Sequence, residues 1–163
     1  MGKKKRILII EDYPLLRIGI RALLSQEADI EVAGESDDGR DAVLLVKVFA
    51  ADLVLMDLSL PGMSGMEAIA DIKRHFPDTR VLVLTMHETS EYVRESLLAG
   101  ADGYVLKDDA HDELRAAIRC VLNGKKYLSS RISAANGCLE AKKLSGYGKG
   151  HNIHAVQHAI DWR

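Results

Sequence analysis

The chain has 163 residues and a formal net charge of −2 at pH 7, with 47% hydrophobic and 28% charged residues. This is the composition of a soluble globular protein of about one domain. No apolar run approaches the roughly 18 residues of a membrane span, and the run after the basic N-terminus is too short for a signal-peptide core, so we expect a cytoplasmic protein with no membrane partner.

Short apolar runs alternate with helical repeats along the whole chain. The repeats place apolar residues three and four positions apart, as on one face of a helix. We expect strands at 7–10, 30–35, 53–56, 81–84 and 103–106, with helices beginning near 14, after 39, at 64, near 90 and near 109. Five rounds of strand and helix predict an α/β fold with a doubly wound parallel sheet. Right-handed crossovers leave few arrangements, and the flavodoxin-like strand order 2-1-3-4-5 fits five strands.

The third of these strands ends at a single carboxylate. Residues 53–56 are all apolar, as expected of a strand buried on both faces, and Asp57 follows them directly. Pro61 and Gly62 then favour a turn. Ser64 and Glu67 form a capping-box pattern that predicts the start of the next helix. In open α/β sheets, ligands and chemistry sit at the carboxyl ends of the strands, so Asp57 is a candidate functional residue.

Two further carboxylates follow the first strand, which this order places beside the third. Glu11 and Asp12 should therefore converge with Asp57. Two unit charges about 4 Å apart repel by roughly 4 kcal/mol at an effective dielectric of 20, so the cluster needs a cation. Oxygen ligands without His or Cys favour Mg²⁺. We expect Asp12, Asp57 and the backbone carbonyl of Ser59 as direct ligands, with Glu11 acting directly or through water.

The fourth and fifth strands end at a hydroxyl and an ammonium group. Thr85 closes the fourth strand and Lys107 follows the fifth. A carboxylate beside Mg²⁺, a hydroxyl and an ammonium suits phosphoryl transfer, with Asp57 as the nucleophile. Mg²⁺ and Lys107 would neutralise charge on the transferring group. Taken singly, a strand-end Thr or Lys is usually only a surface residue, but the convergence of these groups favours chemistry.

Four motifs together resemble a known family. They are Glu11-Asp12, the run from Asp57 to Gly65, Leu84-Thr85-Met86-His87 and the run from Gly103 to Asp108. Over residues 5–125 the chain resembles the CheY-like receiver domain of bacterial two-component response regulators. Two details resemble the NarL/FixJ (LuxR-type) subfamily, namely the run from Asp12 to Arg17 and the pair Lys107-Asp108.

This resemblance implies a signalling function. It implies phosphotransfer from a sensor histidine kinase to Asp57, followed by slow self-dephosphorylation, in a protein that is otherwise not an enzyme. It implies a switch in which Tyr104 turns inward when the Thr85 hydroxyl moves to the phosphoryl group, although β propensity alone explains an aromatic there. The fourth helix, fifth strand and fifth helix would form the output surface. The family also implies transcription regulation and a homodimer on phosphorylation.

The end of the chain follows a different pattern. We expect a receiver domain at 1–126 and a linker-like, atypical tail at 127–163, partly disordered or a short helix. The tail shows no recognisable helix-turn-helix, so we expect DNA contact only if an output domain is present. Cys120 and Cys138 match no metal or redox spacing, and we expect two free thiols.

Two other functions share parts of this pattern. A phosphatase of the haloacid-dehalogenase kind also uses Asp, Thr, Lys and Mg²⁺, but it carries a second Asp two residues after the nucleophile, where this chain has Ser59. A flavin or nucleotide binder would need a glycine-rich phosphate loop after the first strand. The chain has Asp12-Tyr13-Pro14 there instead.

Overall fold

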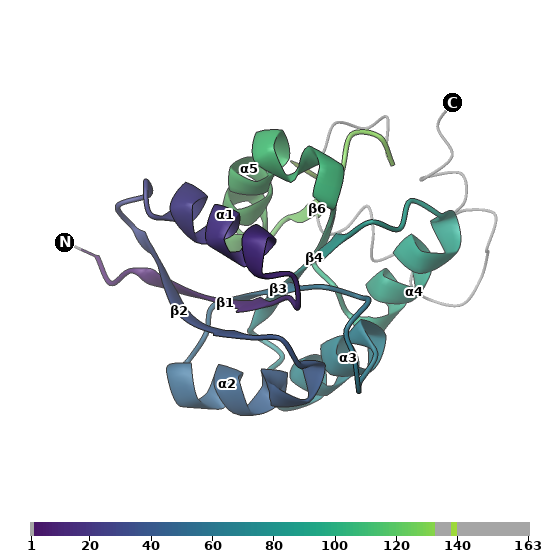
Figure 1. Cartoon of the computed structure of the whole chain (residues 1–163), viewed down its shortest axis with the longest axis horizontal. Coiled ribbons are helices and arrows are strands. Elements are labelled where there is room, and N and C mark those ends of the chain that lie inside the picture. The colour runs from purple at the N-terminus through teal and green to yellow at the C-terminus, as the bar shows by residue number, and fades with distance from the viewer. Residues whose placement is uncertain (1, 133–137, 140–163) are drawn as a thin grey trace. The chain divides into compact units, whose positions relative to one another are not determined.

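The computed structural model describes residues 2–132 and 138–139. Strands and helices alternate along it (Figure 1). The strands are β1 (Lys5–Ile10), β2 (Ile30–Ser36), β3 (Leu53–Met56), β4 (Arg80–Thr85), β5 (Gly103–Leu106), β6 (Lys126–Leu128) and β7 (Cys138–Leu139). The helices are α1 (Pro14–Leu24), α2 (Ala42–Phe49), α3 (Gly65–His75), α4 (Ser90–Ala99) and α5 (Ala110–Leu122), with 3-10 turns η1 (Gly39–Asp41) and η2 (Lys107–Asp109).

The strands follow the order β2-β1-β3-β4-β5-β6-β7 along the sheet. The pairs β1–β2, β1–β3, β4–β5 and β5–β6 are parallel, and β6–β7 is antiparallel. The predicted α/β class and the order 2-1-3-4-5 are confirmed, but the expected count of five strands is wrong. β6 has only three residues, which is too short to give a clear strand pattern in the sequence. It forms because its backbone pairs with the edge of β5.

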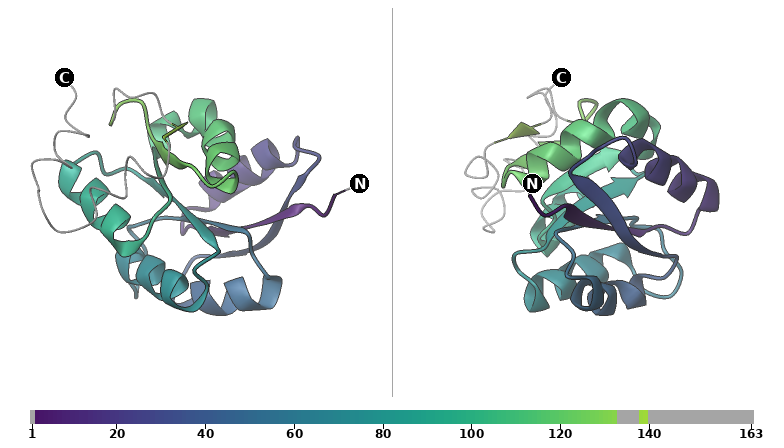
Figure 2. Two further views of the ribbon diagram at one scale, coloured as in Figure 1. Left: turned by 180° about the vertical axis from the view of Figure 1, so that it is seen from behind. Right: turned by 90° about the vertical axis from the view of Figure 1, so that its left-hand side faces the viewer.

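The described residues form two compact units, one that ends at Val81 and one that begins at Leu82. In the first unit, β1 lies between β2 and β3. α1 covers one face of these strands, and α2 and α3 cover the other (Figure 2). The side chains of residues 7–10 are completely buried, and those of residues 53–56 are at most 1% exposed. Both central strands are therefore covered on two faces, as their unbroken apolar runs predict.

In the second unit, α5 packs against β5 and β6. α4 lies on the opposite side of these strands (Figure 2). Tyr104, in the middle of β5, is completely buried, as are Leu114 and Ile118 on the inner face of α5. The core of this unit therefore forms between β5 and the inner face of α5.

Local signals explain where three helices begin or end. Pro14 occupies the first turn of α1, where its missing N–H costs nothing. Ser64 caps α3, because its side chain accepts a hydrogen bond from the backbone N–H of Glu67 at 3.2 Å. Gly100 ends α4 with a φ of 114°, a left-handed conformation that glycine adopts without strain.

The end of the chain differs in part from expectation. Most of the tail expected at 127–163 lies outside the described residues, and the boundary at 126 stays a prediction. Residues 127 and 128 pair with β5 as part of β6. Cys120 is disulfide-bonded, so the expectation of a free thiol at this residue is wrong. The side chain of Cys138 lies outside the described part of the structure. Sequence spacing does not reveal which side chains meet in the fold.

Candidate functional site

Three carboxylates meet where β1 and β3 end. β1 and β3 are parallel neighbours, with Ile10 in register with Met56. The residues that follow these two strands therefore emerge side by side. Glu11, Asp12 and Asp57 each offer one carboxylate oxygen, and these oxygens lie within 4.8 Å of one another. The convergence predicted from the strand order is present in the first unit.

The charge of this cluster is largely shielded from water. Glu11 and Asp57 are each 2% exposed, whereas Asp12 is exposed. Burying a carboxylate is costly unless it is paired or coordinated. Close negative charges add repulsion, roughly 4 kcal/mol for a pair about 4 Å apart at an effective dielectric of 20. An all-oxygen ligand set of this kind fits a hard divalent cation, and Mg²⁺ suits it best.

Backbone hydrogen bonds hold the carboxylates in place. The N–H of Asp57 donates to the carbonyl of Ile10 at 3.0 Å, and the N–H of Glu11 donates to that of Ser36 at 2.9 Å. The N–H of Ser59 donates to Oδ1 of Asp57 at 3.0 Å. The acidic side chains are thus anchored to rigid strands, and one oxygen of Asp57 is oriented by its own loop. That the Ser59 carbonyl binds the metal stays a prediction.

The loop after Asp57 is closely packed at two glycines. A Cβ at Gly65 would lie 2.6 Å from the carbonyl oxygen of Asp57, closer than real Cβ atoms approach. Gly62 has a φ of 84°, and a Cβ there would lie 3.1 Å from Nε of Arg40. The sequence indicated a turn and a helix start here, but only the fold reveals how closely these backbones approach.

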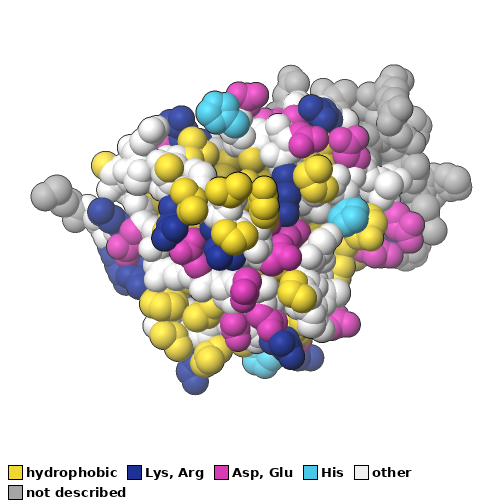
Figure 3. Space-filling view, viewed as in Figure 1, with side chains coloured by type: hydrophobic (Ala, Val, Ile, Leu, Met, Phe, Trp, Pro, Cys, Tyr) yellow, Lys and Arg dark blue, Asp and Glu magenta, His cyan; other side chains and the backbone are white. Residues whose placement is uncertain are grey.

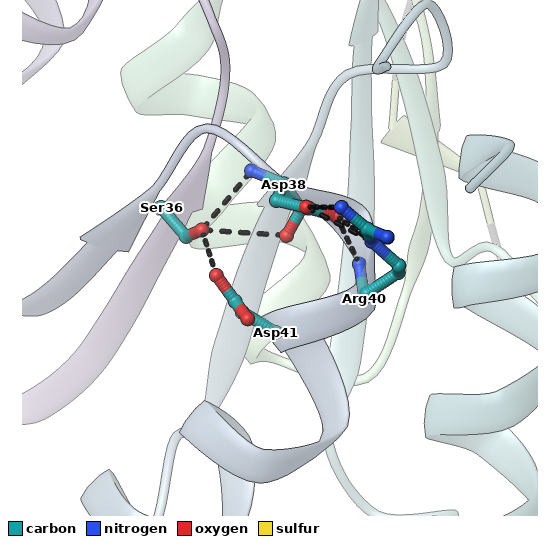
Figure 4. Close-up of polar contacts among 4 residues, drawn as sticks. All are labelled: Ser36, Asp38, Arg40 and Asp41. Carbon is teal, nitrogen blue, oxygen red and sulfur yellow. Dashed lines mark hydrogen bonds and ion pairs between the residues drawn. The ribbon is translucent and has the colours of Figure 1, made fainter. Parts of the chain in front are cut away.

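A polar network in the β2–α2 loop borders the same region (Figure 4). Ser36 Oγ accepts from the N–H of Asp38 at 3.0 Å and donates to Asp41 at 2.7 Å. The Arg40 guanidinium pairs with the carboxylate of Asp38. Hydrogen bonds from Arg40 lower the pKa of Asp38. Because Arg40 is exposed and Asp38 is only partly buried, this pair shapes the loop more than it stabilises the fold.

In the second unit, Thr85 ends β4 and Tyr104 lies in β5. Thr85 is completely buried, and its Oγ1 accepts from the N–H of His87 at 3.2 Å. The hydroxyl of Tyr104 donates to the carbonyl of His87 at 2.6 Å. Burial, followed by the charge of Tyr92, raises the pKa of Tyr104 against the opposing hydrogen bond with Thr85. The Tyr104 ring is therefore inward in this structure, next to the β4–α4 loop.

Lys107 is the first residue of η2, directly after β5, and it is partly buried. The predicted site residues thus fall into two groups. Glu11, Asp12 and Asp57 come together in the first unit. Thr85 and Lys107 occupy strand ends of the second unit. The catalytic, metal-binding and switching roles of these residues stay predictions.

Comparison with known proteins gives a consistent result. The family described as "Response regulator receiver domain" matches residues 7–119. The transcriptional regulatory protein DegU of Brevibacillus brevis is 38% identical over 130 residues, which is 80% of this chain and 55% of that protein. The response regulator UvrY of Escherichia coli is 39% identical over 127 residues, covering 78% of this chain and 58% of that protein.

A solved structure shows the same architecture. The two-component response regulator of the LuxR family from Aurantimonas sp. SI85-9A1 has a TM-score of 0.72 at 35% identity, covering 76% of this chain and 89% of that one. This chain spans less than two thirds of the length of the curated relatives named above. The comparisons give no support to the phosphatase alternative.

Proposed function

This chain belongs to the response regulator receiver family of two-component systems, of the LuxR or NarL/FixJ type, and from that premise we propose that Asp57 is its phosphoacceptor. The observation that carries the proposal is the buried cluster of Glu11, Asp12 and Asp57. Its phosphodonor partner is a sensor histidine kinase. The protein is a signalling domain, and the chemistry it performs is limited to its own phosphorylation and dephosphorylation.

The reaction is a displacement at phosphorus. A carboxylate oxygen of Asp57 attacks the phosphorus of a phosphohistidine and forms a new P–O bond. The P–N bond breaks, its electron pair stays on the imidazole, and that nitrogen takes a proton from solvent. The protein contributes by holding the nucleophile on the end of a rigid strand, with Oδ1 already oriented by the Ser59 N–H.

Mg²⁺ is the proposed cofactor. When bound, it supplies positive charge that neutralises the developing charge on the phosphoryl oxygens. Asp12, Asp57 and the Ser59 carbonyl would hold it, with Glu11 directly or through water. The proximity of the three carboxylates supports this assignment.

Thr85, Tyr104 and Lys107 carry the remaining roles. The Lys107 ammonium neutralises the phosphoryl group, and the Thr85 hydroxyl donates a hydrogen bond to one of its oxygens. A phosphoryl group adds about −1.5 to −2 charge units, enough to bias a two-state element. The β4–α4 loop is the proposed element, because the backbone of His87 forms hydrogen bonds with the side chains of both Thr85 and Tyr104. α4, β5 and α5 then present the output surface.

The relatives suggest the wider setting. DegU is named as a transcriptional regulatory protein, so we place this chain in transcription control, with DNA contacted only if an output domain is present. Among the described residues, none of the helices is long and apolar enough for a bilayer span. A cytoplasmic location suits a partner of histidine kinases.

A mass measurement tests the phosphoacceptor assignment. The protein is incubated with acetyl phosphate and Mg²⁺, and intact mass spectrometry counts the phosphoryl groups added. We expect one group on the wild type, none on Asp57→Asn, and one on Asp78→Asn, which removes an exposed carboxylate elsewhere in the same unit. Equal labelling of the Asp57→Asn variant would show that the assignment is wrong.

We also propose a homodimer on phosphorylation. Large apolar side chains are exposed on α1 (Leu15, 66%; Ile18, 52%) and on α2 (Leu44, 61%; Val48, 63%), and Figure 3 shows hydrophobic side chains gathered over both helices. Such patches often mark protein contacts. Light scattering with and without beryllofluoride and Mg²⁺ should show a doubling of mass. Ile18→Glu and Val48→Glu then identify the helix involved, and an unchanged mass in wild type contradicts the dimer.

A further inference from the structure

Ser129 hydrogen-bonds to the backbone of two residues near the end of β5. It follows β6 directly and is completely buried. Its backbone N–H donates to the carbonyl of Tyr104 at 2.8 Å, and its Oγ accepts from the N–H of Leu106 at 3.2 Å. The register of β6 with β5 ends at Leu128, which pairs with Tyr104. The Ser129 side chain therefore continues the hydrogen bonding of β5 beyond the last strand pair.

Glu113 on α5 fixes the direction of that hydroxyl. Ser129 Oγ donates to Oε2 of Glu113 at 2.7 Å, and Asp109 is more distant at 3.4 Å. A hydroxyl has one hydrogen, so the shorter contact takes it and an Oγ lone pair faces Leu106. Tyr127 Oη and the N–H of Ser130 donate to Oε1 of the same carboxylate, at 3.0 and 3.1 Å.

The ionised state of Glu113 is favoured by these contacts. Burial acts to raise the pKa of this carboxyl, but the hydrogen bonds from Ser129, Ser130 and Tyr127 together outweigh it and lower the pKa. A carboxylate that accepts several hydrogen bonds is held in one position. Ser129 is therefore clamped between α5 on one side and the last residue of β5 on the other.

The residue after Leu106 is Lys107, the proposed phosphoryl-binding cation. Lys107 begins η2, so its Cα position depends on how β5 ends. The Leu106 N–H is buried, and Ser129 Oγ satisfies it. Without that acceptor, the junction of β5 and η2 would have to shift to find another partner for this N–H.

We propose that Ser129, oriented by Glu113, is a positioning residue for Lys107 in the phosphorylation of Asp57. The inference rests on the proposed function and adds two residues to it. Ser129 lies beyond the matched receiver segment, residues 7–119. So do Tyr127 and Ser130, which also donate hydrogen bonds to Glu113. A displacement of about 1 Å in a positioned group can cost on the order of 100-fold in rate, so a small shift of the junction is measurable.

The first test compares Ser129→Ala with Ser96→Ala. Ser96 is also completely buried, and its hydroxyl donates to the carbonyl of Val93 at 2.9 Å within α4, so the control loses the same atom elsewhere in the unit. We expect Ser129→Ala to slow the initial rate of labelling by acetyl phosphate about 5- to 50-fold, and Ser96→Ala less than twofold. The Mg²⁺ affinity measured by calorimetry should stay unchanged in both, because the acidic cluster is intact. A wild-type labelling rate in Ser129→Ala overturns the proposal.

A second test separates positioning from general structure. In a Lys107→Ala background, adding Ser129→Ala should cause no further slowing, because the group to be positioned is gone. If Ser129→Ala slows labelling equally in the wild type and in the Lys107→Ala variant, Ser129 does not act through Lys107, and the inference is overturned. Glu113→Gln keeps the side-chain shape and should slow labelling by a smaller factor. If Ser129→Ala does not fold, Glu113→Gln replaces it in the comparison with Ser96→Ala and in the Lys107→Ala background. Labelling of Asp57→Asn, by contrast, refutes the proposed function itself.

Discussion

Gly65 lies against the backbone of Asp57. A Cβ at Gly65 would sit 2.6 Å from the Asp57 carbonyl oxygen and 2.6 Å from Cα of Leu58. Both of these atoms belong to the backbone and cannot swing away as a flexible side chain would. The N-terminus of α3 therefore packs directly against the backbone of Asp57, the proposed phosphoacceptor, and only glycine permits this approach.

Gly65→Ala should destabilise the fold and disturb the site together. Overpacking of this kind costs about 1–3 kcal/mol, and we expect the upper part of that range because backbone must move. Gly19→Ala is the matched control, since Gly19 is an exposed position of α1 with nothing within 4 Å of an added Cβ. It should stabilise by about 0.5–1 kcal/mol through helix propensity.

Urea unfolding of both variants measures these changes, and acetyl phosphate labelling reports on Asp57. Gly65→Ala should lose stability and labelling rate, whereas Gly19→Ala should lose neither. If Gly65→Ala unfolds at the same urea concentration as wild type, the close approach of α3 to Asp57 is not a constraint on the fold.

Asp12→Asn should have opposite effects on stability with and without metal. In metal-free protein the substitution removes one of three converging charges, so we expect it to stabilise the fold by about 1 kcal/mol, since Asp12 is exposed and its repulsion is screened. In Mg²⁺ the wild type gains binding free energy, about 2.7 kcal/mol at a concentration of 100 Kd. The variant gains less because it has lost a ligand charge.

Thermal unfolding in EDTA and in Mg²⁺ measures both effects. Asp78→Asn, which changes the same charge at an exposed turn, should show the wild-type response to metal. Identical Mg²⁺-induced shifts in Tm for wild type and Asp12→Asn would remove Asp12 from the ligand set.

The acidic cluster was predictable because two simple signals act together. Unbroken apolar runs identify β1 and β3 as buried strands, and the residue after each run is necessarily at the carboxyl edge. The strand order then places Glu11 beside Asp57, and their oxygens do meet. Hydrophobic pattern and strand order together therefore determine where these carboxylates lie, and the sequence is enough to predict that they meet.

Other features depend on contacts that leave no pattern in the sequence. Ser129 and Glu113 are 16 residues apart, and their hydrogen bond follows from the packing of α5 on β6. The close approach of Gly65 to Asp57 likewise arises from tertiary packing, because the capping box predicts only where α3 starts. The sequence predicts a linker at β6, because its three residues show too little periodicity to identify a strand.

Tyr104→Phe should reduce stability at neutral pH and flatten its loss at alkaline pH. The substitution removes the 2.6 Å hydrogen bond to the His87 carbonyl, at a cost of about 1 kcal/mol. Burial raises the pKa of Tyr104 in the folded state. Stability is therefore intact below the ordinary tyrosine pKa and falls as pH rises toward the raised value, since only the unfolded chain ionises.

Urea unfolding between pH 8 and about 11 tests this slope. The pKa of Tyr127 is raised as well, by burial and by its bond to Glu113, so Tyr104→Phe should remove only part of the alkaline loss. A slope unchanged from wild type would mean that Tyr104 ionises as easily in the folded protein as in the unfolded chain.

Glu113→Gln should make the stability of the protein less dependent on acidic pH. Burial acts to raise the pKa of Glu113, but hydrogen bonds lower it overall, so the folded state favours the ionised form. The resulting stabilisation is complete above the pKa of the unfolded chain and is lost as pH falls through the lowered value. At neutral pH we expect the variant to be less stable by about 1 kcal/mol, as for a typical hydrogen bond at a partly exposed group.

The difference between wild type and Glu113→Gln should therefore shrink as pH falls from 7 through the acidic range. Asp112→Asn removes a neighbouring exposed charge on the same turn of α5 and controls for general charge effects near the helix start. The protection factor of the Leu106 amide, which is its intrinsic exchange rate divided by the rate measured by NMR, should fall across the same pH range in step with the loss of stability, because protonated Glu113 holds the Ser129 hydroxyl less firmly. A protection factor of the Leu106 amide that does not change with pH would show that Glu113 does not control the end of β5.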